Sequence, residues 1–233
     1  MSGPIVLILG AGKGVGLASA SYFAAQGYRV AVVSRSISAD AYPSYLTINA
    51  DLADPKSIEP IFERVRSSLG EPNVVIYNAS AWTPPVDHLL DLKLEALQAS
   101  LNINHVSAVV AAQQAVLSFS RIPDGGKKVF LFTGNLFNEQ VIPRFWSIGA
   151  AKAATAHVII AAAASYKEKG YRFHYVDERT DEGYPVYSDV DGEAHANIFY
   201  KLVENPTDQP IVTFSKGKGI HDFGFVLSKE SVK

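Results

Sequence analysis

The chain has 233 residues, and its 48% hydrophobic content is enough to fill the core of one α/β domain. The formal net charge of −2 argues against a nucleic-acid surface, and the lack of cysteine excludes disulfides, thiol catalysis and cysteine-bound metals. The apolar run Ile5–Leu9 is too short for a signal peptide, and the alanine-rich stretch 150–164 carries Lys152 and His157. We therefore expect a cytoplasmic protein that does not bind membranes.

Short apolar runs alternate with helical patterns from the N-terminus onward. Asp54 can cap the second predicted helix, with Pro55 at its first position. The elements predicted for the first third of the chain are strand Ile5–Leu9, helix Gly14–Gly27, strands Tyr28–Ser34 and Tyr45–Asn49, a helix ending near Ser68, and strand Asn73–Asn78.

A loop over 80–92 follows, because Pro84-Pro85 argues against a helix there. The remaining predicted elements are helix 94–120, strand Lys127–Thr133, helix Trp146–Glu168, strand Arg172–Val176, a substrate-side loop over 177–192, helix Gly192–Glu204 and strand Ile211–Ser215. This alternation predicts an α/β fold in which residues 1–233 form a single Rossmann-type domain. Its core would be a doubly wound parallel sheet of about seven strands with helices on both faces.

A glycine-rich turn joins the first strand to the first helix. A backbone without side chains can turn tightly and approach a pyrophosphate, and the helix N-terminus offers free N–H groups to the phosphates. The strand before the turn and the helix after it favour this interpretation over an ordinary glycine-rich turn. The predicted phosphate-binding residues are Gly10, Gly12, Lys13, Gly14, Val15 and Gly16.

The spacing of Gly10, Gly14 and Gly16 resembles that of the short-chain dehydrogenase/reductase family, and the resemblance extends over most of the chain. Asp51-Leu52 stands where the family contacts adenine, and Asn78-Ala79 matches part of the family's Asn-Asn-Ala-Gly motif. Asn104 matches the asparagine of a long helix that organises a proton-relay water in the family. The resemblance implies an oxidoreductase that uses a nicotinamide cofactor on a small-molecule substrate.

The end of the second strand indicates which dinucleotide is bound. NAD-binding proteins place an acid there, where it accepts a hydrogen bond from the ribose 2′-hydroxyl. This chain has Ser34 followed by Arg35, whose guanidinium could bind a 2′-phosphate. Lys13 lies where NADP-preferring members of the family carry a second base. Each cation alone could be a solvated surface charge, but together they predict NADP(H).

The catalytic motif of the family is incomplete. In the family, a tyrosine transfers the proton, a lysine lowers the pKa of that tyrosine, and a serine binds the substrate oxygen. The tyrosine lies four residues before the lysine, on the same helix face. Lys152 fits the lysine, which puts Ile148 at the tyrosine position, and Gly134 falls at the serine position between Thr133 and Asn135. The chain thus resembles a divergent group, common in fungi, that lacks the catalytic serine and tyrosine.

The Pro-Gly pair that usually follows the sixth strand is replaced by charged residues. Asp177, Glu178 and Arg179 would then face the site from a loop. Two interpretations remain open: these residues form a local ion pair that stabilises the loop, or Asp177 and Glu178 join Lys152 and Asn104 as catalytic residues. The six histidines show no metal-ligand spacing, so no metal site is predicted.

Isoleucine cannot donate a proton or stabilise an alkoxide, so Ile148 argues against ordinary ketone reduction. Hydride delivery to an iminium needs no proton, and an activated C=C bond needs only an acid elsewhere. The alternative is a non-catalytic NADP(H)-binding sensor, scaffold or partner subunit. A pocket that is open and polar over the nicotinamide C4 would favour catalysis, whereas a pocket filled by Ile148, Trp146 and the 177–191 loop would favour the alternative.

Helices 94–120 and 146–168 are apolar nearly all round, so each needs a second packing partner. In the family these helices form the subunit interface. The resemblance therefore implies a homodimer or homotetramer.

Overall fold

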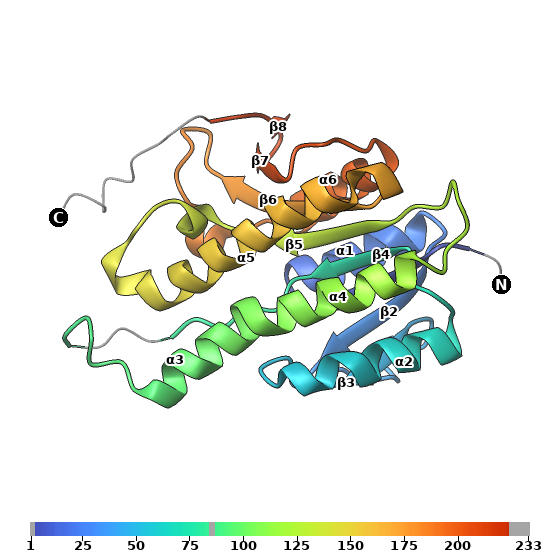
Figure 1. Ribbon diagram of the computed structural model, residues 1–233, viewed down its shortest axis with the longest axis horizontal. Coiled ribbons are helices and arrows are strands. Elements are labelled where there is room, and N and C mark those ends of the chain that lie inside the picture. The colour runs from blue at the N-terminus through green and yellow to red at the C-terminus, as the bar shows by residue number, and fades with distance from the viewer. Residues whose placement is uncertain (1–2, 84–86, 224–233) are drawn as a thin grey trace.

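The computed structural model describes residues 3–83 and 87–223, so residues 84–86 of the predicted 80–92 loop lie outside the described range (Figure 1). Its middle layer is an eight-stranded sheet with the order β3-β2-β1-β4-β5-β6-β7-β8. The strand bounds are β1 Ile5–Leu9, β2 Arg29–Ser34, β3 Leu46–Asn49, β4 Val74–Tyr77, β5 Val129–Thr133, β6 Arg172–Arg179, β7 Ile211–Ser215 and β8 Gly219–Ile220. The strands are parallel except for β8, which pairs antiparallel with β7.

Helices cover both faces of the sheet, as Figure 1 shows. On one face lie α1 Val15–Ala25 and α6 Gly192–Glu204. On the other lie α2 Ile58–Ser68, α4 Ser107–Phe119 and α5 Trp146–Tyr166, with α3 Leu94–Leu101 leading into α4. The predicted doubly wound sheet is therefore confirmed. The winding direction reverses between β1 and β4, which is where open α/β sheets form their ligand crevice.

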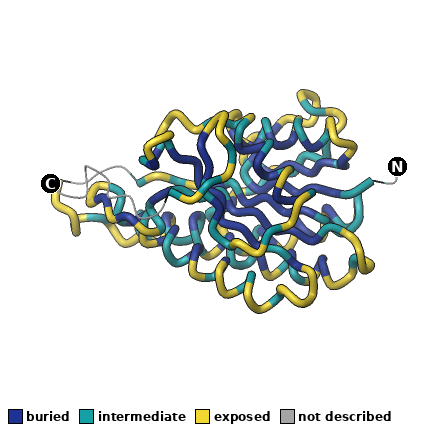
Figure 2. Tube along the Cα trace, turned by 90° about the horizontal axis from the view of Figure 1, so that it is seen from above, coloured by how far each residue is buried: buried dark blue, intermediate teal, exposed yellow. Residues whose placement is uncertain are grey.

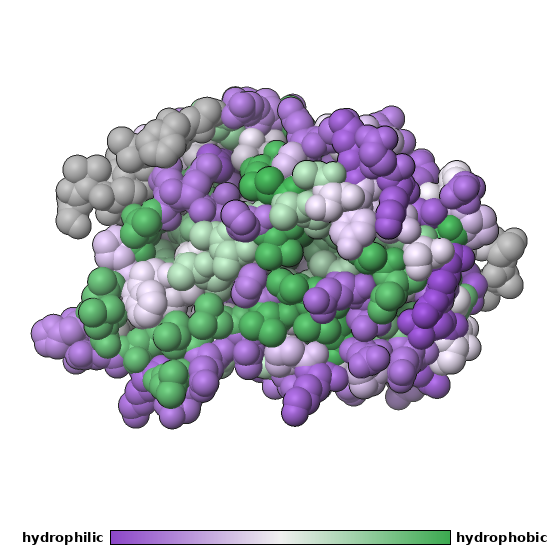
Figure 3. All heavy atoms as spheres, viewed as in Figure 1, coloured by the Kyte–Doolittle hydropathy of each residue, from purple (hydrophilic) through white to green (hydrophobic). Residues whose placement is uncertain are grey.

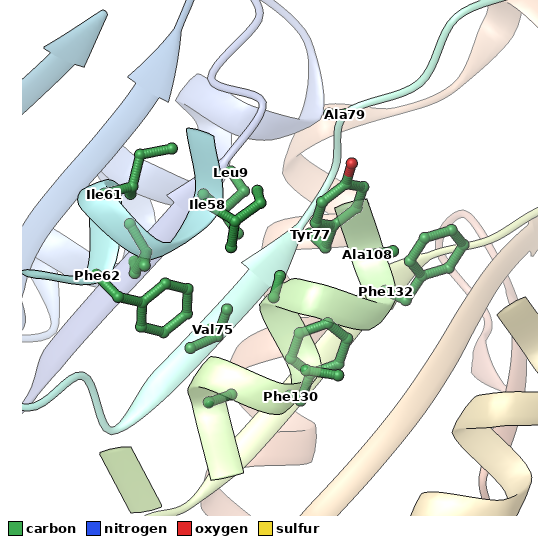
Figure 4. Packing of buried hydrophobic residues seen from close by; sticks show 14 of the residues in the cluster. Leu9, Ile58, Ile61, Phe62, Val75, Tyr77, Ala79, Ala108, Phe130 and Phe132 are labelled. Atoms are coloured by element: carbon green, nitrogen blue, oxygen red, sulfur yellow. The ribbon is translucent and has the colours of Figure 1, made fainter. Parts of the chain in front are cut away.

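The core follows from the alternation of side chains along the strands. On β1, Leu7 and Leu9 point to the α2/α4/α5 face while Val6 and Ile8 point to the α1/α6 face. Figure 4 shows Leu9 and further buried side chains of the first face, and Figure 2 shows the buried strands surrounded by exposed loops. Each such fully buried side chain contributes about 1.5–3 kcal/mol.

The structure differs from the sequence-based prediction at three elements. Helix 94–120 is interrupted by a π-helical turn over Asn102–Val106. The sixth strand does not end at Val176 but continues to Arg179, so the predicted 177–192 loop begins three residues too early. Asp177 and Arg179 point to the same side of this strand and pair with each other, which lets charged residues occupy a buried strand. The two-residue β8 was not predicted.

The segment Pro143–Lys169, which contains α5, is apolar and long enough to cross a membrane by length and composition. One such helix is weak evidence, because the core helix of a soluble protein passes the same test. Its side chains at Ser147, Lys152 and Thr155 are buried within the described structure. Only 39% of its most apolar window is buried, so much of its apolar surface is uncovered in the single chain.

Candidate cofactor and active site

The glycines of the turn between β1 and α1 have two different structural roles. Gly10 has a φ of +102°, and a Cβ there would collide with the backbone of Ala79; a Cβ on Gly16 would collide with Gly10. A Cβ on Gly12 or Gly14 would meet nothing within 4 Å. Gly10 and Gly16 thus allow close packing, while Gly12 and Gly14 leave open space beside the uncapped N-terminus of α1.

A cavity of about 440 Å³, here called the turn cavity, opens beside this turn. Its wall includes Ala99 and Ile103 from the long helical segment. The predicted cofactor residues that line it are Gly10, Gly12, Ser34, Arg35, Asp51, Leu52, Asn78 and Ala79. Lys13 is exposed and Gly16 is buried, and neither lines this cavity.

A second cavity of about 590 Å³, here called the central cavity, adjoins the first, because Asn78 and Ser80 line both. Val15, Ile148 and Lys152 lie on its wall. The other lining residues are Thr133, Gly134, Asn135, Glu178, His195 and Pro185 to Ser188, together with Val190 and the aromatic residues Trp82, Phe137 and Phe145. The cavity is open, and Trp146 does not line it; the Trp146 indole N–H donates to the carbonyl of Leu89 at 3.0 Å.

Lys152 presents a buried amine to the central cavity. Its Nζ donates to the carbonyl of Thr133 at 2.8 Å and lies 4.4 Å from the centre of the Phe132 ring. Burial lowers the pKa of Lys152 to about 7, although the nearby Asp177 opposes the shift. Ile148, one helical turn earlier, is buried at the same wall.

Gly134 is held against Tyr175. A Cβ on Gly134 would collide with the Tyr175 ring, so a serine does not fit there unless Tyr175 moves. The Tyr175 hydroxyl donates to the carbonyl of Asn135 at 2.7 Å and accepts from its N–H at 3.0 Å. The Asn135 Oδ1 accepts from Phe137 N–H, while its Nδ2 has no partner among the described residues. That amide can donate to a ligand in the central cavity.

Asp177 and Glu178 point to opposite faces of β6. Asp177 is fully buried, and its Oδ2 accepts from the Arg179 Nε at 2.7 Å; Arg179 also pairs with Glu139. Burial raises the pKa of Asp177 to about 6 although Arg179 opposes the shift. Asp177 does not line the central cavity, so its position does not support the predicted catalytic role. Asp177 and Arg179 form the local ion pair that was the other interpretation.

Glu178 does line the central cavity, beside a histidine that the sequence did not single out. The Glu178 Oε2 accepts from the N–H of Asp191 at 2.8 Å and lies 3.2 Å from the Nδ1 of His195. His195 is nearly fully buried, on α6. It lies 17 residues after Glu178 in the sequence. Only the packing of α6 beside β6 brings the two together, and no sequence motif indicates the pair.

Asn104 lies in the π-helical turn and is fully buried. Its Oδ1 accepts from the Ser80 hydroxyl at 2.6 Å, and its Nδ2 donates to the carbonyls of Ala81 and Ser100. It lines neither cavity. In this structure Asn104 therefore positions the segment 80–81, which does line the turn cavity.

This fold, with its glycine-rich turn between β1 and α1, is that of a Rossmann-type oxidoreductase. Residues 10–180 match the sequence profile of the family described as Enoyl-(Acyl carrier protein) reductase. The chain is 39% identical to the short chain dehydrogenase/reductase dmxR12 of Cryptosporiopsis sp., over 96% of each protein. The chain belongs to the short-chain dehydrogenase/reductase family, as its motifs predict.

More distant proteins are similar in sequence or in structure. The chain is 20% identical to an NADPH-dependent aldehyde reductase-like protein of Arabidopsis thaliana, over 73% of this chain and 69% of that protein. A short chain dehydrogenase from Burkholderia cenocepacia, solved in complex with NADP, superposes with a TM-score of 0.76 at 22% identity, covering 91% of this chain and 95% of that one. A 3-ketoacyl-(acyl-carrier-protein) reductase from Brucella melitensis, complexed with NADH, gives 0.77 at 17% identity, covering 91% and 96%.

Proposed function

We propose that this protein is an NADP(H)-dependent oxidoreductase that reduces an iminium or an activated C=C bond of a small molecule. The central cavity carries this proposal. It is open, it adjoins the turn cavity, and it brings Lys152, Asn135 and Glu178 to one space.

The residues present fit NADP(H). The open space at Gly12 and Gly14 would admit the phosphates, and the Arg35 guanidinium lies at the turn cavity where a 2′-phosphate would bind. Lys152 would hold the nicotinamide ribose. When bound, NADPH supplies a hydride. Solved proteins with this fold hold NADP in one case and NADH in another, so the choice of NADP(H) rests on Arg35.

The central cavity favours substrates that need no tyrosine. Ile148 contributes only apolar surface at its wall. An iminium carbon that accepts a hydride leaves a neutral amine, so there is no oxyanion to stabilise. For an activated C=C bond, Lys152, with its pKa of about 7, or Glu178 would have to supply the proton.

A titration of NADPH against NADH, followed by NADPH turnover with a panel of imines and enones, tests this function. We expect the Arg35→Ala variant to bind NADPH about 10- to 100-fold more weakly while its NADH affinity stays the same, because only the 2′-phosphate is lost as a partner. The Lys201→Ala variant, which removes an exposed cation outside the turn cavity, serves as the control. Equal binding of both cofactors by the wild type would contradict the NADP(H) assignment.

A non-catalytic NADP(H)-binding role is the second candidate. The position of Tyr175 favours this role, because its ring fills the space that a side chain at position 134 would need. Tight NADPH binding without oxidation by any imine or enone would support it.

A further inference from the structure

We propose that the central cavity selects a flat aromatic substrate that carries a protonated nitrogen, with the Glu178 carboxylate accepting the nitrogen's N–H and an aromatic wall holding the ring. The aromatic wall is Trp82, Phe137, Phe145 and Tyr187. This inference rests on the proposed function, because it chooses the iminium among the two proposed substrate classes.

The Glu178 carboxylate is buried, and only one of its two oxygens accepts a hydrogen bond from the described residues. The Glu178 side chain is 3% exposed, and its Oε2 receives the Asp191 N–H. The His195 Nδ1 lies 3.1 Å from the Asp191 carbonyl and 3.2 Å from the Glu178 Oε2. Both of those oxygens are acceptors, so this nitrogen carries the hydrogen. Oε1 has no partner among the described residues, although Glu178 lines the cavity.

A buried carboxylate is costly to desolvate, and a cationic partner in the same low-dielectric space offsets that cost. Three basic groups lie near the Glu178 carboxylate: His195 and Lys152 on the cavity wall, and Lys216 outside the wall. The Lys152 Nζ is already donating to the Thr133 carbonyl, and burial lowers its pKa to about 7. Above about pH 7 Lys152 is therefore mostly uncharged, and a ligand cation meets little repulsion from it.

The aromatic wall supplies the flat surface. Phe137 and Phe145 stack with their ring centres 5.0 Å apart, and the Tyr187 ring lies 6.2 and 6.0 Å from them. Trp82 meets Phe145 edge-on at 6.3 Å. Tyr187 adopts a φ of +49°, a strained backbone conformation for a non-glycine residue, and such strain is concentrated at ligand sites. Aromatic faces also attract cations.

Hydride transfer to an iminium needs no proton from the tyrosine of the family. The iminium carbon accepts the hydride, the C=N π pair moves to nitrogen, and the neutral amine forms as NADPH becomes NADP⁺. Glu178 keeps the bound imine protonated, because a nearby carboxylate favours the cationic form, and exchanges no atom with it. Ile148 contributes only apolar surface.

Binding of 1,2,3,4-tetrahydroisoquinoline, which is protonated at about pH 8 and cannot be reduced further at nitrogen, tests the inference against its neutral relative 1-tetralone. By calorimetry we expect the wild type to bind the amine at least about tenfold more tightly. In Glu178→Gln this preference should disappear, whereas Phe137→Leu should weaken both ligands. Glu193→Gln, an exposed carboxylate on α6, the helix that carries His195, is the matched control.

Equal binding of amine and ketone by the wild type, or a preference unchanged by Glu178→Gln in a protein that melts normally, would overturn the inference. Turnover separates it from the proposed function. Glu178-dependent amine binding with no NADPH oxidation by 3,4-dihydroisoquinoline or by any imine or enone of the panel defeats the function alone. NADPH oxidation by enones, with no amine binding, defeats the inference alone.

Discussion

Lys152 combines a charge with a position that is only 3% exposed. A buried ammonium is disfavoured, and the backbone carbonyl of Thr133 replaces only part of its hydration. The pKa of Lys152 in the folded protein is therefore about 7, against an ordinary value of 10.5. Lys152, which would hold the cofactor, thus lowers the stability of the cofactor-free protein at neutral pH and below.

This shift predicts the pH dependence of stability. Between about pH 7 and 10.5 the unfolded chain binds more protons than the folded one, so the free energy of unfolding rises with pH. At ~1.4 kcal/mol per pKa unit the rise amounts to a few kcal/mol. This rise in the free energy of unfolding should be absent in Lys152→Met, and the variant should be more stable than the wild type at about pH 6. Urea unfolding across this range measures the effect, with Lys201→Met as control; parallel curves for wild type and Lys152→Met would contradict it.

The buried pair of Asp177 and Arg179 predicts a second effect. Removing the cation in Arg179→Met leaves a fully buried carboxylate without its partner, which should cost about 3–5 kcal/mol. The double variant Asp177→Asn/Arg179→Met should recover much of that loss, because asparagine carries no charge. Urea unfolding checks both. The exposed pair of Lys167 and Asp208 is the comparison, and its loss should change stability by less than about 1 kcal/mol.

At the scale of elements, the turn between β1 and α1 offers a matched pair of substitutions. Gly16→Ala places a methyl group against the Gly10 carbonyl and should lower the melting temperature by several degrees. Gly12→Ala has free space, so the protein should melt normally but bind NADPH about 10-fold or more weakly. Thermal melts and a fluorescence titration give both readouts. If Gly12→Ala binds NADPH with wild-type affinity, the phosphates do not bind beside Gly12.

The strands were predictable because their buried runs are apolar, as at Val74–Tyr77. β6 was ended too early because charged residues after Val176 indicate a surface, and only the pairing with Arg179 lets Asp177 stay buried. The turn cavity was foreseen from motifs local in sequence. The pair of Glu178 and His195 was not, since it depends on how α6 packs against β6.

At the scale of the whole molecule, the helices α4 and α5 leave apolar surface uncovered. Leu117 and Ile160 are 48% and 46% exposed, and Figure 3 shows hydrophobic residues gathered across the face these helices form in this view. Exposed apolar patches of this kind mark protein interfaces. We propose that two or four copies of the chain associate through these helices.

The variant Leu117→Lys/Ile160→Lys tests the interface. Two buried cations would disrupt it, so light scattering should show a dimer or tetramer for the wild type and a monomer for the variant. Leu90→Lys, at an 80% exposed leucine in the 80–92 segment, should keep the wild-type mass. A monomeric wild type would refute the proposed assembly.

The contact between Gly134 and Tyr175 has a consequence for the evolutionary history of this site. A mutation of Gly134 to serine alone collides with the tyrosine ring. Replacing Tyr175 alone leaves the N–H and C=O of Asn135 without their partner and opens a void in the core. Each single step is therefore unfavourable, although the two together could be tolerated. The effects of the two substitutions therefore depend on each other: from a chain that has both Gly134 and Tyr175, no favourable single mutation leads to a serine at position 134, and new chemistry has to use the other groups of the cavity.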